Sequence, residues 1–121
     1  MPLKVRKNPC PPPPNECPLS ECLSIIRGVW TPNIIWYLGG GPRRFGELRV
    51  DIPGISAKML TARLRELEDR GVLDRHVMPT SPPSVEYNLT ALGRELLPVL
   101  ESMAHVSHKL KRHAAASQPR P

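Results

Sequence analysis

The sequence contains few aromatic residues and no long apolar segment. Phe, Trp and Tyr account for 4% of its 121 residues, too small a share for a surface on which the bases of a single strand stack in succession. No apolar run approaches the roughly 20 residues that a membrane-spanning helix requires. Residues 1–16 carry positive charge but no apolar segment, so they do not read as a secretory signal. We therefore expect a cytoplasmic protein that does not enter the membrane.

Sequence patterns of catalytic and metal sites are also missing. There is no GxxxxGK[ST] or GxGxxG loop, no CxxC or HExxH motif, and no nucleophile paired with a base. The three cysteines, Cys10, Cys17 and Cys22, are normally reduced in a cytoplasm, so we expect no disulfide framework. Several histidines near the C-terminus lack further converging ligands. The sequence thus predicts neither an enzyme nor a metal or cofactor site.

Positive charge is what the sequence has in excess. It holds 17 Lys and Arg against 11 Asp and Glu, a net charge of +6. A chain of 121 residues has room for one domain with a modest core. This charge balance fits a basic surface in contact with solvent, and it equally fits attraction to a polyanion such as nucleic acid.

Proline marks the ends of the folded part. Residues 1–16 include a run of prolines, which lack the N–H group and fix φ, so helix and central strand are both excluded there. We expect a disordered or polyproline II arm over residues 1–16. A folded domain over residues 17–111 and a second disordered tail over residues 112–121 complete the predicted organisation.

Two short helices are predicted at the start of the domain. Pro18 suits the first position of a helix, which makes Cys17 its N-cap, and an apolar stripe follows at Leu19, Leu23 and Ile26. The pair Thr31–Pro32 repeats the signal for a second helix, PNIIWYL. Because this second helix is apolar on almost every side, we expect it to be buried.

The central feature is a helix that begins at Ser56, a good N-cap, and stops at Gly71. Its apolar stripe consists of Leu60, Leu64 and Leu67, and its opposite face of Lys58, Thr61, Ala62 and Arg65. A preceding helix and the turn Pro53–Gly54 complete a helix-turn-helix. A cationic face with small residues in its middle suits the DNA major groove, where such side chains meet phosphates, base edges and thymine methyl groups.

The orientation of the acidic side chains on the same helix is also predicted. Glu66 and Arg70 are spaced to pair at i, i+4. Glu66, Glu68 and Asp69 should all turn away from phosphate because their charge is of the same sign.

Strands and a long helix are predicted after Gly71. Two runs with a period of two, residues 73–78 and 85–89, predict strands joined by a Pro- and Ser-rich wing. Thr90 then caps a last helix that continues to about Lys111 with a kink at Pro98. The apolar arc of this helix is wider than one small domain can cover, and it includes Leu96, Leu100, Met103, Val106 and Leu110. Together with the stripe of the first helix, this surface predicts a homodimer.

These segments resemble the HxlR family of bacterial winged-helix transcriptional regulators. The resemblance runs from residue 17 to about residue 110, and its most specific stretches are GVWTPNII at 28–35, GPRRFGELRVDIPGIS at 41–56, KMLTARLRELEDRGVLDR at 58–75 and PPSVEYNLTALGREL at 82–96. It implies a winged helix-turn-helix, mainly α with a small antiparallel β-hairpin. It also implies a homodimer built from the first and last helices, a recognition helix that starts near Ser56, and a wing along the minor groove. Some members of the family sense oxidants or electrophiles through a cysteine in the position of Cys17.

We therefore predict a transcriptional regulator that binds a near-palindromic operator in double-stranded DNA as a homodimer. A winged-helix module that binds protein or RNA is the alternative. The predicted DNA contacts are Ser56, Lys58, Met59, Thr61, Ala62, Arg65, Arg43, Arg44, Arg75, Ser81 and Ser84. The predicted dimer contacts are Leu19, Leu23, Ile26, Leu96, Leu100, Met103, Val106 and Leu110. Cys17 is the candidate redox sensor, because a helix N-terminus favours the thiolate that oxidants and electrophiles attack.

Overall fold

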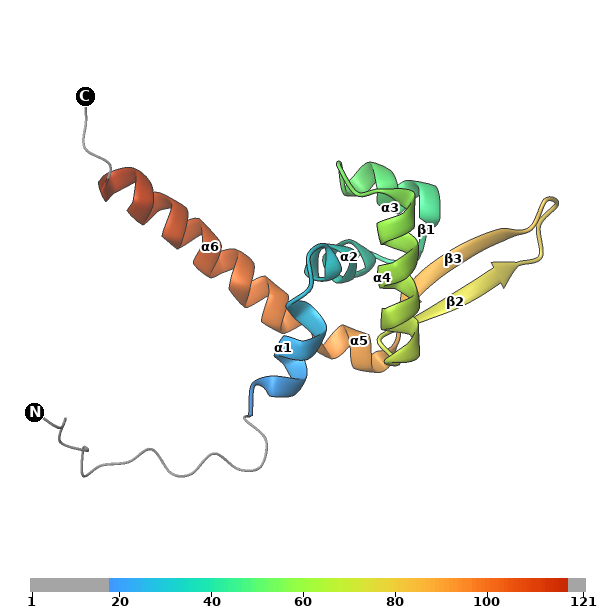
Figure 1. Ribbon diagram of the computed structural model, residues 1–121, viewed down its shortest axis with the longest axis horizontal. Helices are drawn as coiled ribbons and strands as arrows, with labels where there is room; N and C mark the ends of the chain where they lie inside the picture. The colour runs from blue at the N-terminus through green and yellow to red at the C-terminus, as the bar shows by residue number, and fades with distance from the viewer. Residues whose placement is uncertain (1–17, 118–121) are drawn as a thin grey trace, which may run out of the picture.

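The computed structural model describes residues 18–117, in which helices and one small sheet follow each other along the chain (Figure 1). The elements are α1 (Ser20–Ile26), α2 (Thr31–Leu38), β1 (Arg43–Arg44), α3 (Phe45–Asp51), α4 (Ala57–Asp69), β2 (Leu73–Met78), β3 (Ser84–Leu89), α5 (Ala91–Glu95) and α6 (Leu97–Ser117). The strands form an antiparallel sheet in the order β1-β3-β2. The predicted fold class, mainly α with a small antiparallel hairpin, is confirmed.

The core lies between α2, α3, α4 and the sheet. The predicted stripe of α4 is buried there, and α2 contributes three side chains with 0% of their surface exposed, Ile34, Ile35 and Leu38. The prediction that α2 is buried is confirmed for this face but not for the face of Trp36 and Tyr37, which are 44% and 39% exposed. This face is turned toward α6, where it lines an open groove.

The helix α4 begins as its sequence predicts. The Ser56 side chain accepts a hydrogen bond from the Met59 N–H at 3.0 Å, which satisfies one of the first N–H groups of the helix. Three leucines then place one face of α4 in the core, since they recur at intervals of three and four residues.

The end of α4 connects directly to the sheet. Gly71 has a φ of 75°, its N–H donates to the Glu68 carbonyl at 3.0 Å, and the Val72 N–H donates to the Leu67 carbonyl at 2.9 Å. This pair of bonds is a Schellman motif, which requires a left-handed residue that glycine adopts at little cost. Val72 is fully buried and β2 begins at the next residue, so the helix end and the root of the hairpin share one short segment.

The first helix begins later than predicted. Its N-cap is Leu19, whose carbonyl accepts the Leu23 N–H at 2.9 Å, so Pro18 lies before the helix. The prediction that Pro18 is the first helical residue, with Cys17 as the N-cap, is therefore wrong. Cys17 itself lies outside the described residues.

The predicted last helix is divided into α5 and α6 instead of being kinked. Thr90 caps α5 as expected, by accepting the Gly93 N–H at 3.0 Å. Pro98 is the second residue of α6, and because it has no N–H group it interrupts the hydrogen-bond ladder at this point. The helix α6 then continues past the predicted end near Lys111 as far as Ser117, so the start of the predicted tail is helical.

Figure 1 shows how these elements are arranged. The helix α4 and the hairpin β2–β3 lie on one side of the molecule, and α6 leaves on the other side and extends beyond the remaining helices. No helix within residues 18–117 combines the length and apolarity that crossing a membrane demands.

Candidate nucleic-acid interface

The outward face of α4 carries the residues that the sequence predicted for DNA. Lys58, Ala62 and Arg65 are exposed, and Thr61 is half-buried beside them. Ser56 and Met59, also predicted, stand at the start of the helix, exposed and half-buried respectively. Among residues 18–117, neither Lys58 nor Arg65 has a carboxylate within 4.0 Å. The two cations are therefore available to an external anion.

A second flank of α4 is fixed to the rest of the domain. The Arg63 Nε donates to the Val29 carbonyl at 3.3 Å, and Arg70 donates to the Ser24 carbonyl at 3.0 Å and to its hydroxyl at 2.7 Å. Glu66 pairs with Arg63 at 3.0 Å, so the prediction that it pairs with Arg70 is wrong. Arg70 instead binds a residue of α1, a long-range contact that helical spacing alone does not reveal.

The hydroxyl of Thr61 is engaged within the helix. Its Oγ1 donates to the Ala57 carbonyl at 2.8 Å, which uses the only proton of the group. A ligand in front of α4 therefore meets Thr61 as an acceptor and a methyl group, and meets the neighbouring Ala62 as a methyl group alone.

Between α4 and the root of the hairpin lies a hollow of about 470 Å³, which we call the α4–wing hollow. Its apolar lining comes from three different elements: Phe45 of α3, Leu64 of α4, and Val85 and Tyr87 of β3. Arg75 and Tyr87 are direct partners across β2 and β3, so both side chains stand on the face of the hairpin that is turned toward α4.

The polar lining of the hollow joins residues that are distant in sequence. Thr61, Arg65 and Glu68 come from α4, and Arg75 comes from β2. Arg75 is exposed, and no carboxylate of the described residues lies within 4.0 Å of it. Glu68 lines the same hollow as the two arginines, although the sequence predicted that it would turn away from an anion. Sequence reasoning missed this position because it depends on how the hairpin packs against α4.

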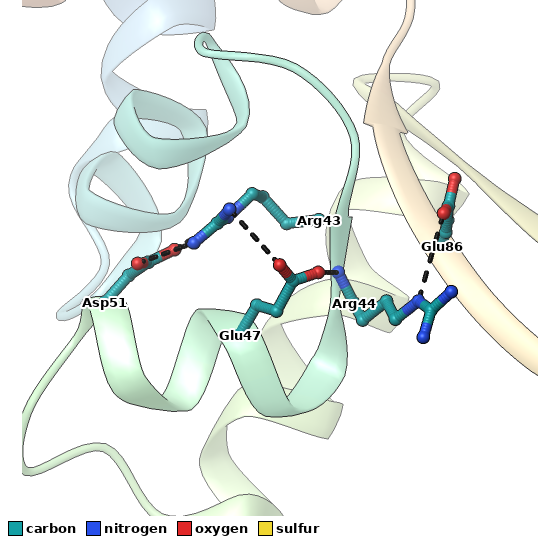
Figure 2. Close-up of polar contacts among 5 residues, drawn as sticks. All are labelled: Arg43, Arg44, Glu47, Asp51 and Glu86. Carbon is teal, nitrogen blue, oxygen red and sulfur yellow. Dashed lines mark hydrogen bonds and ion pairs between the residues drawn. The ribbon is translucent and has the colours of Figure 1, made fainter.

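Arg43 and Arg44, both predicted to contact DNA, are paired with carboxylates (Figure 2). Arg43 crosses from β1 to α3, where its Nε and one terminal nitrogen donate to Asp51 at 2.9 and 2.8 Å and the other donates to Glu47 at 3.3 Å. The hydrogen bonds to Asp51 are the main cause that raises the pKa of the Arg43 guanidinium above its ordinary value. Arg44 lies 3.9 Å from Glu86 and remains about half exposed. Arg43 therefore holds β1 against α3, whereas Arg44 is more exposed and has only the longer contact with Glu86.

The tip of the wing is organised by a residue that the sequence analysis did not select. The Thr80 hydroxyl donates to the Pro82 carbonyl at 2.9 Å and accepts the Ser84 N–H at 3.2 Å. Ser81, predicted to contact DNA, is exposed at this tip, and Ser84 is half-buried at the start of β3. Thr80 thus joins the loop that carries Ser81 to Ser84 at the start of β3.

The predicted dimer residues divide into two groups. Leu96 and Leu100 are 6% and 5% exposed because they pack in the core of their own chain, so they do not offer a surface to a partner. Ile26 is half-buried against the same core. The other predicted residues are exposed and apolar, namely Leu19, Leu23, Met103, Val106 and Leu110. Val99, which was not predicted, is exposed as well.

These features are those of a winged helix-turn-helix, and the sequence matches a known family of that type. Residues 25–114 match the model of the HxlR-like helix-turn-helix family. The chain belongs to this family. It is a transcriptional regulator of the helix-turn-helix type, a class that does not consist of enzymes.

Individual relatives agree with this assignment. The chain is 43% identical over 107 residues to an uncharacterized HTH-type transcriptional regulator of Synechocystis sp., in an alignment that covers 88% of this chain and 76% of that protein. The redox regulator HypR in its reduced form superposes with a TM-score of 0.76 at 35% identity, covering 82% of this chain and 98% of HypR. Reduced YodB of Bacillus subtilis superposes with a TM-score of 0.68 at 40% identity, covering 74% and 89%.

Proposed function

We propose that this transcriptional regulator acts by binding double-stranded DNA, with α4 in the major groove and the wing, β2–β3 with its connecting residues 79–83, along the adjacent minor groove. The observation that supports this most directly is the outward face of α4, on which Lys58 and Arg65 have no carboxylate partner in the described chain. Short side chains between these two cations allow the helix to approach base edges closely. Phosphate contacts supply much of the affinity of such complexes.

The alternative, a winged helix that binds protein, predicts an apolar outward face on α4. None of the large apolar side chains of α4 is exposed. The aromatic stacking on which recognition of single-stranded RNA commonly relies is also absent from this face, since α4 contains no aromatic residue. Both observations favour duplex DNA.

We further propose that the protein is a homodimer formed through α1 and α6. The exposed residues Val99, Met103, Val106 and Leu110 recur at intervals of four, three and four, which is the spacing of a seam between two helices. All four belong to α6, the helix that extends away from α4 and the wing (Figure 1). A twofold dimer of this kind presents two copies of α4, so the operator should be a near-palindrome with half-site centres roughly 34–36 Å apart or a multiple of that distance.

Selection of bound sites from random duplex DNA tests this function. We expect enriched sites with twofold symmetry, and we expect Lys58→Ala to weaken binding to them. Lys111→Ala is the matched control, because it removes the same charge from α6 instead of α4. Equal affinity of the wild type for every duplex, or an unchanged affinity of Lys58→Ala for the selected site, contradicts the proposed docking of α4.

Oxidant sensing by Cys17 remains a proposal for this chain. It is supported by the similarity to HypR, which is described as a redox regulator. On the described part of the chain, Cys22 is exposed on α1, the helix that follows Cys17. Its position on a proposed dimer helix links modification near this point to the arrangement of the two subunits.

A further inference from the structure

The α4–wing hollow lies where a DNA strand has to pass if the proposed docking is correct. One sugar-phosphate strand separates the major groove from the minor groove beside it. A protein with one element in each of these adjacent grooves therefore faces that strand with the surface between the two elements. In this chain that surface is the hollow lined by Arg65 and Glu68 of α4 and by Arg75 of β2.

The two arginines that border the hollow are suited to a phosphate. They come from different elements, so they approach the hollow from its two sides. Neither is within 4.0 Å of a carboxylate of residues 18–117, unlike Arg43, Arg44 and Arg63. The guanidinium group is always charged and presents several N–H donors in a planar fork that matches phosphate oxygens.

Glu68 gives the hollow an opposing charge. It follows Arg65 by three residues on α4, which places the two side chains on neighbouring parts of the helix surface, and it lines the same hollow. Its carboxylate forms no ion pair with either arginine. A phosphate in the hollow is therefore attracted by two cations and repelled by one anion.

We propose that the α4–wing hollow binds one backbone phosphate of the strand between the two grooves. Arg65 and Arg75 share this phosphate, and Glu68 weakens the contact, so that affinity for any DNA stays below what the arginines alone would give. The inference rests on the proposed docking of α4 and the wing. It assigns Arg65 to the DNA backbone, whereas its position on the outward face of α4 alone allows contact with either a phosphate or a base edge. Base recognition is left to Lys58, Thr61 and Ala62.

The dependence of binding on salt distinguishes a shared phosphate from other contacts. The slope of log affinity against log salt is about −0.9 for each phosphate that is neutralised. A dimer has two hollows, so loss of one shared phosphate per subunit reduces the magnitude of the slope by about 1.8. Two arginines that bind separate phosphates would instead give a reduction of about 3.6 when both are removed.

The experiment measures affinity for the selected operator and for a scrambled duplex over a series of salt concentrations. The variants are Arg65→Gln, Arg75→Gln, the double variant, Glu68→Gln, and Arg94→Gln on α5 as a control of matched charge. We expect the double variant to lose about 1.8 of the slope, each single variant to lose less, and both duplexes to weaken by the same factor. Glu68→Gln should bind both duplexes more tightly, by about five-fold at low salt, with the gain declining as salt rises.

Several results overturn the inference. A slope change near 3.6 in the double variant means separate phosphates. An unchanged slope, with loss of preference for the operator in Arg65→Gln, means that Arg65 reads a base. If Glu68→Gln binds no more tightly than the wild type, Glu68 does not weaken the phosphate contact. Failure of the proposed function is seen separately, as a wild-type protein that binds neither duplex in a salt-dependent manner.

Discussion

Substitution of Gly93 should destabilise the domain strongly, because this glycine touches the backbone at the junction of α4, β2 and α5. A Cβ atom built on Gly93 overlaps the carbonyl oxygen of Val72 and lies 3.1 Å from Leu89. That same carbonyl accepts the Thr90 N–H at 3.0 Å, and the Thr90 side chain accepts the Gly93 N–H at 3.0 Å. Alanine at this position therefore has to push α5 away from the end of α4.

The size of the effect follows from these contacts. Overpacking of a dense site costs about 1–3 kcal/mol and occasionally more, and each hydrogen bond lost with it adds about 1 kcal/mol. We therefore expect Gly93→Ala to lower the free energy of unfolding by about 3 kcal/mol or more, out of the roughly 5–15 kcal/mol of a typical domain. Urea denaturation at one fixed protein concentration measures it, since the stability of the proposed dimer would depend on concentration.

Two further glycines serve as controls for this prediction. A Cβ on Gly71 or on Gly46 meets no atom within 4 Å. Gly71 has a positive φ of 75°, so Gly71→Ala should cost only the left-handed conformation, about 1–2 kcal/mol. Gly46 lies in α3 and does not have a positive φ, so Gly46→Ala should raise the free energy of unfolding by about 0.5–1 kcal/mol. If Gly93→Ala loses no more stability than Gly71→Ala, the steric argument is refuted.

Three more outcomes are expected. Thr61→Val should keep the methyl group of Thr61 and bind the operator like the wild type, whereas Thr61→Ser should lose discrimination by about 1 kcal/mol. When the operator thymines are replaced by uracil one at a time, one replacement should weaken binding of the wild type and of Thr61→Val but not of Thr61→Ser. Competition assays with the substituted operators measure this difference. Val106→Glu should give a monomer in sedimentation with an unchanged helical circular dichroism spectrum, and a persistent dimer would show that α6 is not the interface. Peroxide or diamide should alter the DNA affinity of the wild type but not of Cys17→Ser, and an equal response of both proteins would remove Cys17 as the sensor.

Local sequence signals predicted the elements around α4 well. Ser56 and Gly71 act within a few residues of their own position, one by capping the start of the helix and the other by adopting a left-handed φ after its end. Their effect therefore does not depend on the remainder of the fold. The apolar stripe of α4 is equally local, since its spacing alone places it on one face.

Long-range contacts account for the predictions that failed. Leu100 and Leu110 have the same chemistry and lie on one helix, but Leu100 packs in the core while Leu110 is 63% exposed. The apolar periodicity of α6 does not show which part of the helix packs against the domain and which part extends beyond it. Arg43 likewise looks free in sequence, and only the packing of β1 against α3 brings Asp51 within 2.8 Å of it.

Thr61 and Glu68 show a similar limit for the candidate interface. The sequence placed Thr61 on the outward face of α4, and the structure adds that its hydroxyl is bonded to Ala57. Glu68 was expected to turn away from phosphate, but it lines the hollow together with Arg65 and Arg75, because the hairpin approaches α4 on that side. Which side chains line the hollow is decided by the angle between helix and hairpin, which no single segment of the sequence contains.

The separation of tasks on α4 has a consequence for how proteins of this kind diverge. The residues that fix the helix, its leucines together with Arg63 and Arg70, occupy positions other than Lys58 and Ala62. Lys58 and Ala62 are exposed side chains with no tertiary hydrogen bond among residues 18–117. After a gene duplication, one copy can therefore accumulate changes at these outward positions without losing its fold. Under the proposed docking of α4, a change of operator preference then requires few substitutions at these positions and no change in the residues that hold the helix in place.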